Sequence, residues 1–174
     1  SKLLSDTKSG IQKVIPAPNG SLALLFADGE LQLVSTQTSM RHIAFGVRGA
    51  IWSPDGQTLL IQTSSEELNT YAPEGTLPVD ATPGELHLIV RLSHPITHLE
   101  WLPDSEHILY QSGGTIIASE TDTRDHAITT TVQESAPANP FTIIERDGKS
   151  FLSIMKNGSL QSIARTWLVT KEDR

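Results

Sequence analysis

The amino-acid sequence predicts an all-β fold made of four four-stranded antiparallel sheets. Residues 50–61 have the pattern of a strand, a tight turn and a second strand, and the same turn recurs three more times along the chain. No segment longer than about ten residues carries the 3.6-residue periodicity of an amphipathic helix. Proline, glycine and β-branched residues punctuate the whole sequence, as they do in chains of short strands.

The turn at Pro54-Asp55-Gly56 is the reference for the other copies. Proline presets the backbone angle for the second position of a type I turn, and aspartate tolerates the third. Glycine adopts the left-handed conformation that follows such a turn. Because Ile51 and Trp52 before the turn and residues 59–61 after it have strand composition, we expect a hairpin here.

Four copies of this turn follow one another along the chain. Their Asp or Asn anchors are Asn19, Asp55, Asp104 and Asp147. The leucines five residues after each anchor are Leu24, Leu60, Leu109 and Leu152. The interval between anchors is about 40 residues, close to the period of propeller blades. A four-stranded sheet cannot bury both of its faces alone, so such sheets stack radially around an axis as a β-propeller.

This arrangement predicts the role of the repeated apolar residues. We expect the four leucines to occupy equivalent positions between blades. We expect Trp52 and Trp101 to pack at the ends of the inner strands. These columns are then core residues and not a binding stripe.

The expected blades cover residues 11–47, 48–92, 95–133 and 141–170, and together form one propeller domain over 11–170. Their expected strands are 12–15, 22–27, 30–34, 41–45, 50–52, 59–63, 68–71, 86–91, 96–102, 108–111, 115–119, 126–132, 141–145, 150–155, 159–164 and 167–170. Residues 1–10 are either a lead-in or an outer strand that closes a ring on the last blade, and 171–174 form a charged tail. Asp28-Gly29 reads as a two-residue hairpin turn. Residues 72–84 read as a long loop and 134–140 as a connector.

Composition narrows the possible functions. The formal net charge of −7 opposes binding to nucleic-acid phosphates. The chain has no cysteine, which excludes disulfides, thiolate zinc sites and cysteine nucleophiles. No run of apolar residues approaches the 18 or more that a membrane span needs. The start of the sequence shows no signal-peptide pattern. Because the sequence begins with Ser1 and not with Met, we expect a longer parent chain. The absence of cysteine does not fix the compartment.

Two copies of the turn carry a fuller motif. These are Trp52-Ser53-Pro54-Asp55-Gly56 with Leu59-Leu60, and Trp101-Leu102-Pro103-Asp104-Ser105 with Ile108-Leu109. The motif resembles the repeat of TolB-like propellers, also called the PD40 or WD40-like β-propeller repeat. The first copy lacks the Trp, and the fourth lacks both Trp and Pro. Related repeats occur in propellers of prolyl-oligopeptidase-like enzymes and in bacterial envelope proteins, so the resemblance implies a fold and carries no catalytic residue with it.

The number of blades leaves three arrangements open. Propellers of the resembled family usually have six to eight blades, and four is the low end of the known range. The chain is a closed four-bladed ring, a half-ring that pairs with a second copy into eight blades, or a piece of a longer parent. An open arc would expose two apolar blade faces. We therefore expect a half-ring that forms a homodimer.

The histidines do not form a recognisable metal site. His94 and His98 have the spacing of a helical metal pair, but Pro95 and the strand-like pattern place them on extended backbone. Residues four apart on a strand share a face but lie too far apart to bind one ion directly.

Acidic residues gather in two places. Glu120, Asp122 and Asp125 lack the regular oxygen ligands and the glycine of a calcium loop, so we expect a solvated turn. Glu66-Glu67, with Asp80 and Glu85, makes the rim of the second repeat acidic. Nothing in the sequence fixes the separation of these carboxylates, which acid–base catalysis requires.

Known catalytic motifs are missing from the sequence. It contains no Gly-x-Ser-x-Gly, Gly-x-Gly-x-x-Gly, Walker or His-Glu-x-x-His pattern. Asn19-Gly20-Ser21 and Asn157-Gly158-Ser159 match the glycosylation pattern, but both lie in predicted tight turns where Asn-Gly is common. We therefore expect no catalytic, cofactor-binding or metal-binding residues and no cofactor.

These observations favour a non-catalytic β-propeller module for protein–protein contact or self-assembly. One alternative is a regulatory propeller attached to a larger hydrolase or envelope protein. Another is a ligand-binding or enzymatic propeller that uses the acidic loops near Glu66, Asp80 or Asp125.

Overall fold

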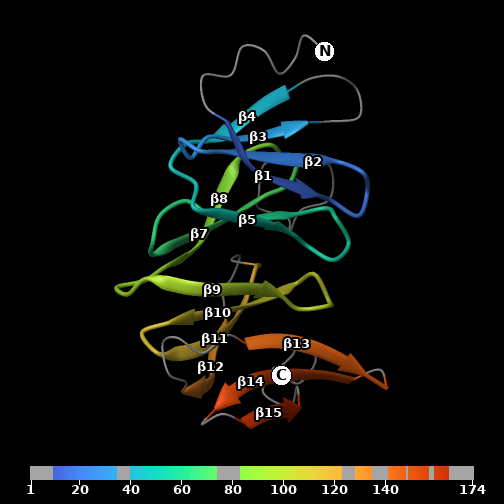
Figure 1. Ribbon diagram of the computed structural model, residues 1–174, viewed down its shortest axis with the longest axis vertical. Helices are drawn as coiled ribbons and strands as arrows, with labels where there is room; N and C mark the ends of the chain where they lie inside the picture. The colour runs from blue at the N-terminus through green and yellow to red at the C-terminus, as the bar shows by residue number, and fades with distance from the viewer. Residues whose placement is uncertain are drawn as a thin grey trace. The chain divides into compact units, whose positions relative to one another are not determined.

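The computed structural model describes residues 10–34, 40–73, 83–122, 128–134, 141–147, 149–156 and 159–164. Every element in these ranges is a β-strand. The strands form four antiparallel sheets, each built from consecutive strands (Figure 1). The chain divides into two compact units, residues 1–91 and 92–174. The predicted fold class is confirmed, whereas the grouping of 11–170 into one domain stays a prediction.

The first unit contains two four-stranded sheets. Sheet 1 comprises β1 (Ile11–Pro16), β2 (Leu22–Phe26), β3 (Leu31–Val34) and β4 (Met40–Ala44). Sheet 2 comprises β5 (Gly49–Trp52), β6 (Leu59–Gln62), β7 (Glu67–Tyr71) and β8 (Leu86–Arg91). The first strands of the two sheets, β1 and β5, contact each other. This is the arrangement expected when sheets stand side by side around an axis.

The second unit repeats this plan. Sheet 3 comprises β9 (Ile96–Trp101), β10 (His107–Ser112), β11 (Thr115–Glu120) and β12 (Thr129–Glu134). Sheet 4 comprises β13 (Phe141–Arg146), β14 (Lys149–Lys156) and β15 (Ser159–Ala164). Here too the first strands, β9 and β13, contact each other. The predicted last strand at 167–170, the segment 1–9 and the tail 171–174 lie outside the described residues.

Most strand boundaries match the sequence prediction to within two residues, with two local corrections. Strand β12 runs on to Glu134, which the prediction placed in the connector. The turn at Asp28-Gly29 is a three-residue loop and not a two-residue one, because Phe26 N–H bonds to Glu30 O at 2.8 Å across it. Gly29 has φ 83°, as a type I turn followed by a left-handed residue requires.

The repeated Pro-Asp-Gly turn has the predicted geometry. Gly56 N–H donates to Ser53 O at 2.8 Å, which places Pro54 and Asp55 at the two central positions. The Asp55 carboxylate accepts from Gln57 N–H at 3.0 Å, closing an Asx turn. The equivalent bonds recur in the first and third copies, from Ser21 N–H to Asn19 and from Glu106 N–H to Asp104.

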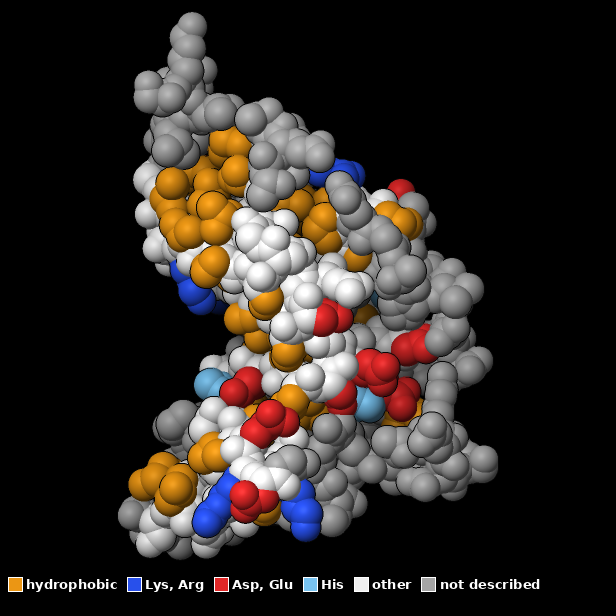
Figure 2. Space-filling view, turned by 90° about the vertical axis from the view of Figure 1, so that its right-hand side faces the viewer, with side chains coloured by type: hydrophobic (Ala, Val, Ile, Leu, Met, Phe, Trp, Pro, Cys, Tyr) orange, Lys and Arg blue, Asp and Glu red, His pale blue; other side chains and the backbone are white. Residues whose placement is uncertain are grey.

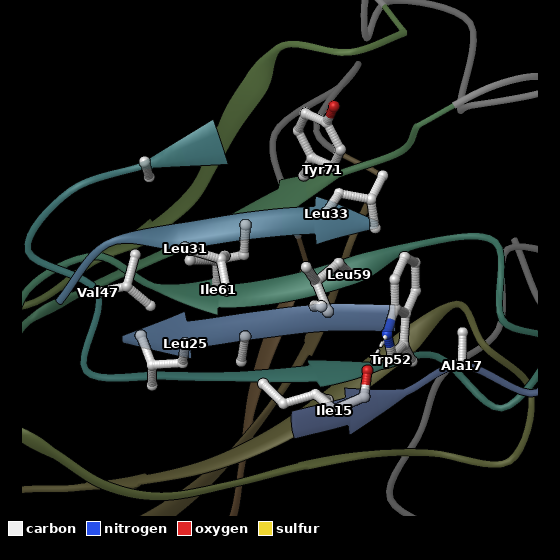
Figure 3. Packing of buried hydrophobic residues seen from close by; sticks show 13 residues of the cluster. Ile15, Ala17, Leu25, Leu31, Leu33, Val47, Trp52, Leu59, Ile61 and Tyr71 are labelled. Carbon is white, nitrogen blue, oxygen red and sulfur yellow. Dashed lines mark hydrogen bonds between the residues drawn. The ribbon is translucent and has the colours of Figure 1, made fainter. Parts of the chain in front are cut away.

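A hydrophobic core lies between the two sheets of each unit. In the first unit, Ala23 and Leu25 of sheet 1 pack with Trp52, Leu59 and Ile61 of sheet 2 (Figure 3). The Trp52 indole N–H donates to the backbone carbonyl of Ile15 at 3.1 Å, so it joins the two sheets directly, as Figure 3 shows. Trp52 is therefore the packing residue that the sequence predicted.

The second core has the same construction. Leu109 and Ala118 of sheet 3 pack with Phe141, Leu152 and Ile154 of sheet 4. We name the face by which the earlier sheet of a unit packs on the later sheet its forward face. Ala23 in sheet 1 and Leu109 in sheet 3 lie on it. The later sheet presents the opposite face, its backward face, marked by Leu59 in sheet 2 and Leu152 in sheet 4.

The predicted leucine column is wrong at its two ends. Leu109 lies on a forward face, and Leu60 alternates with the core residues Leu59 and Ile61, so it lies on one too. Leu24 alternates with the core residues Ala23 and Leu25 and therefore lies on a backward face, as does Leu152. A change of one residue in a hairpin moves every following side chain to the other face.

Turn length explains both exceptions. The first turn closes between Ala17 N–H and Ser21 O, whereas the second closes between Ser53 N–H and Thr58 O, one residue longer. In sheet 4, where Arg146 stands in place of the proline, the ladder continues to the pair Arg146–Lys149, so this hairpin is shorter than the other three.

Candidate interaction site

The backward face of sheet 1 is turned away from the core that this sheet shares with sheet 2. Val14 pairs with Leu24 across β1 and β2, and Leu24 pairs with Gln32 of β3, so these side chains share this face. Val14 is 52% exposed although it is a β-branched apolar residue, whereas Leu24 on the same face is 6% exposed. In the space-filling view, hydrophobic side chains gather on the first unit (Figure 2).

The forward face of sheet 4 is turned away from the core that this sheet shares with sheet 3. Ile144 pairs with Phe151, and Met155 pairs with Leu160, which places all four on the face opposite Leu152. Ile144, Met155 and Leu160 are 43%, 42% and 64% exposed. Figure 2 shows hydrophobic side chains at the lower left of the second unit, close to Lys and Arg side chains. Exposed apolar groups of this density mark contact surfaces more often than scattered single residues do.

Polar side chains on these two faces bond to one another. On sheet 1, Gln32 donates to the Glu30 carboxylate at 2.7 Å, and His42 Nδ1 lies 3.1 Å from the same oxygen. On sheet 4, the hydroxyls of Ser153 and Ser162 lie 3.1 Å apart. A polar group that already has a partner can be covered at little cost, whereas an unpaired one cannot. The polar side chains named here on both faces therefore already have partners.

Two sheets of the first unit are also joined by an arginine. Arg41 of β4 donates to the backbone carbonyl of Gly84 at 3.1 Å, and its guanidinium lies 5.9 Å from the centre of the Tyr71 ring. Burial raises the pKa of Tyr71, and the positive charge of Arg41 opposes that shift. The arrangement holds the residues before β8 against sheet 1.

The acidic residues singled out from the sequence do not form a catalytic pair in the described residues. Glu66 accepts from the Ser65 hydroxyl at 2.7 Å, and Glu67 forms an ion pair with Arg91 Nε at 2.7 Å. Glu85 is exposed, whereas Asp80 lies outside the described residues. The two adjacent carboxylates thus have separate structural partners.

The second acidic group consists of Glu120, Asp122 and Asp125, and the structure describes the first two. Glu120 ends β11 opposite His107, and Asp122 follows it. Asp125 lies outside the described residues. In the described part of the chain, no three His, Asp or Glu side chains lie close enough to hold a metal ion.

The two spaced histidines have different partners. His94 Nδ1 lies 3.1 Å from the Ser93 hydroxyl, and the His98 ring meets the Phe141 ring edge-on at 4.4 Å. Asn19 of the first glycosylation pattern uses both ends of its amide, accepting from Ser21 N–H and donating to Gly56 O at 2.7 Å. It thereby connects the turns of sheets 1 and 2. Asn157 of the second glycosylation pattern lies outside the described residues.

One buried pair was missed in the sequence. His107 Nδ1 lies 2.9 Å from Asp104 Oδ2, and the imidazole side chain is 8% exposed. Its Nε2 is buried and has no partner among the described residues. The Asp-x-x-His spacing at the third turn was the available signal. Since Asp104 also accepts from His107 N–H at 3.1 Å, the pair fixes the start of β10.

Comparison with known proteins identifies the architecture. No family model and no curated protein matches the sequence. The β-propeller domain of Cps50 (Swd1) from Myceliophteria thermophila matches with a TM-score of 0.61 and 16% identity, over 90% of this chain and 54% of that one. Sqt1 from Saccharomyces cerevisiae matches with a TM-score of 0.58 and 11% identity, over 90% and 46%. The fold is a β-propeller.

At these identities the likeness shows the fold alone. The propeller chain spans about half the length of the solved structures it matches. None of the described residues forms a helix long and apolar enough to cross a membrane.

Proposed function

We propose that this chain is a non-catalytic propeller module that makes protein–protein contacts, including contacts with a second copy of itself. The observation that carries the proposal is the pair of sheet faces with exposed apolar side chains, the backward face of sheet 1 and the forward face of sheet 4. Inside each unit, equivalent faces are buried against a neighbouring sheet. An apolar face gains about 25 cal/mol for each Å² removed from water.

The length of the matched propellers supports pairing with a second copy. Each solved structure continues for about as many residues again beyond the part that this chain matches. Two copies with four sheets each would supply that length as an eight-bladed ring. The dimer is therefore the specific form of self-assembly that we propose.

A second candidate is a regulatory propeller within a larger hydrolase or envelope protein of the TolB-like, PD40 type. It is favoured by the Trp-x-Pro-Asp-Gly turn of sheet 2 and the Trp-x-Pro-Asp-Ser turn of sheet 3, which adopt one geometry. A hydrolase domain in the same reading frame would decide for it. In that case the remaining blades would come from the parent chain.

The mass of the chain in solution tests the proposal. Multi-angle light scattering across a concentration series is expected to give twice the 18.9 kDa of one chain. A mass of one chain at every concentration would contradict self-assembly. Turnover of peptides or glycosides that is lost in Glu66→Gln would contradict the non-catalytic part.

A further inference from the structure

Each core of this protein joins two different kinds of face. In the first unit the forward face of sheet 1 packs on the backward face of sheet 2. In the second unit the forward face of sheet 3 packs on the backward face of sheet 4. In both units, the two faces that meet in the core are lined by buried apolar side chains.

Of the faces outside these two cores, the backward face of sheet 1 and the forward face of sheet 4 carry exposed large apolar side chains, and these two faces are also of different kinds. Sheet 1 leaves its backward face, with Val14 52% exposed. Sheet 4 leaves its forward face, with Leu160 64% exposed. A forward face and a backward face are the combination that buries apolar side chains in both cores.

We infer that the forward face of sheet 4 in one copy packs on the backward face of sheet 1 in a second copy, and that this contact occurs twice in a two-fold dimer. The inference rests on the proposed self-assembly and names its faces. Contacts between unlike faces form a closed ring when the rotations that relate successive copies add up to a full turn. Two copies give the smallest ring of this kind.

The exposed side chains on the backward face of sheet 1 and the forward face of sheet 4 are better suited to contact with each other than to a highly charged partner. The exposed apolar residues that we place in the contact are all uncharged: Val14, Ile144, Met155 and Leu160. The serine pair of sheet 4 and the Glu30 group of sheet 1 are already hydrogen-bonded. Such a patch has an apolar centre with a satisfied polar edge, as protein interfaces do.

Two charged variants test the pairing. Val14→Glu changes only the sheet 1 face, and Leu160→Lys changes only the sheet 4 face; each replaces a side chain that is more than half exposed, so folding should survive. We expect each variant alone to be monomeric by light scattering at concentrations where the unmodified chain is dimeric. Leu88→Lys on β8, at a residue 41% exposed outside both faces, is the matched control and should stay dimeric.

Mixing the two variants separates this inference from its alternatives. In an equimolar mixture, one of the two contacts has both faces unaltered, and the other brings a carboxylate and an ammonium together. We therefore expect the mixture to form dimers. Circular dichroism of each variant, unchanged from the parent, confirms that a loss of dimer is not a loss of fold.

The other outcomes are distinguishable. If one variant alone remains dimeric, like faces pair and the inference is wrong, while the proposed self-assembly stands. The inference is also wrong if both remain dimeric or if the mixture stays monomeric. If the unmodified chain is monomeric throughout, both the inference and the proposed self-assembly fail.

Discussion

At the scale of single residues, the repeated turn depends on one left-handed position. Gly20 and Gly56 occupy it in the first two copies, with φ 88° and 72°. Ser105 occupies it in the third with φ 60°, and in sheet 4 Asp147 has φ 53°. Residues with a Cβ are strained in this conformation, whereas glycine is not.

Replacing Asp147 by glycine should stabilise the protein. Glycine relieves the backbone strain of the left-handed conformation. The substitution also removes the ion pair with Arg146, but both side chains of that pair are exposed, so it contributes little to stability. We expect Asp147→Gly to raise the free energy of unfolding by about 0.5–1 kcal/mol in urea titrations. Gly20→Ala is the reciprocal control, because a Cβ there meets nothing within 4 Å. It should cost about 1 kcal/mol through backbone strain alone. A destabilised Asp147→Gly would show that the side chain, and not the backbone, holds this turn.

Tyr110 should make the protein sensitive to alkali. It is 1% exposed, and burial raises the pKa of its phenol to about 12 from 10.0. A raised folded-state pKa means that this contribution to stability is complete below pH 10 and is lost as the pH rises toward 12. The free energy of unfolding, measured by denaturant titration from pH 9 to 12, should fall by about 2–3 kcal/mol from this group. Tyr110→Phe should have a shallower pH dependence in that window. An equal slope in both proteins would contradict the assignment.

At the scale of elements, Arg41 connects sheet 1 to the start of β8. A Cβ on Gly84 would lie 2.6 Å from Arg41 Nη2 and 2.8 Å from Nη1, so the guanidinium would have to move. Gly84 also has φ 81°. We expect Gly84→Ala to cost somewhat more than Gly20→Ala, because the Arg41 guanidinium, which bonds to the Gly84 carbonyl, would also have to move.

A double-mutant cycle isolates this contact. Combining Gly84→Ala with Arg41→Ala should cost less than the sum of the two single changes, because the crowded group is gone. Thermal unfolding of the four proteins measures the coupling. Strict additivity would mean that Arg41 and Gly84 do not interact in solution.

Sequence reasoning predicted the strands well because they depend on local pattern. The alternation of β3 and the turn chemistry around Pro54 needed no knowledge of distant contacts. Sequence reasoning failed to predict which sheet face Leu24 and Leu152 lie on, because the face on which a side chain lies depends on the length of the preceding turn. An Asp anchor can be aligned in sequence even when the hydrogen bonds that close its turn differ by one residue.

The candidate site was predictable only in outline. An open set of blades implies exposed end faces, but the residues on them depend on strand register. Val14 and Leu160 looked like ordinary strand residues until pairing placed them opposite the cores. The Asp104–His107 pair had a readable spacing, but its burial did not follow from the sequence.

At the scale of the whole molecule, the proposed dimer is held by apolar contact. Its dissociation constant should therefore be unchanged or lower when ionic strength rises from about 0.1 M to 1 M, over which the Debye length falls from about 10 to 3 Å. Sedimentation equilibrium at both salt concentrations measures this. A dimer that dissociates at high salt would point to charged contacts and away from the faces of sheets 1 and 4.

Thiol accessibility tests the central claim most directly, since the chain has no cysteine of its own. Val14→Cys and Leu160→Cys each place a single thiol on one proposed contact face, and Gln57→Cys in the exposed turn of sheet 2 is the reference. At concentrations where the chain is dimeric, the thiols at 14 and 160 should react with a maleimide much more slowly than the one at 57, and should become equally reactive on dilution. Reaction of all three at the same rate at every concentration would contradict the account.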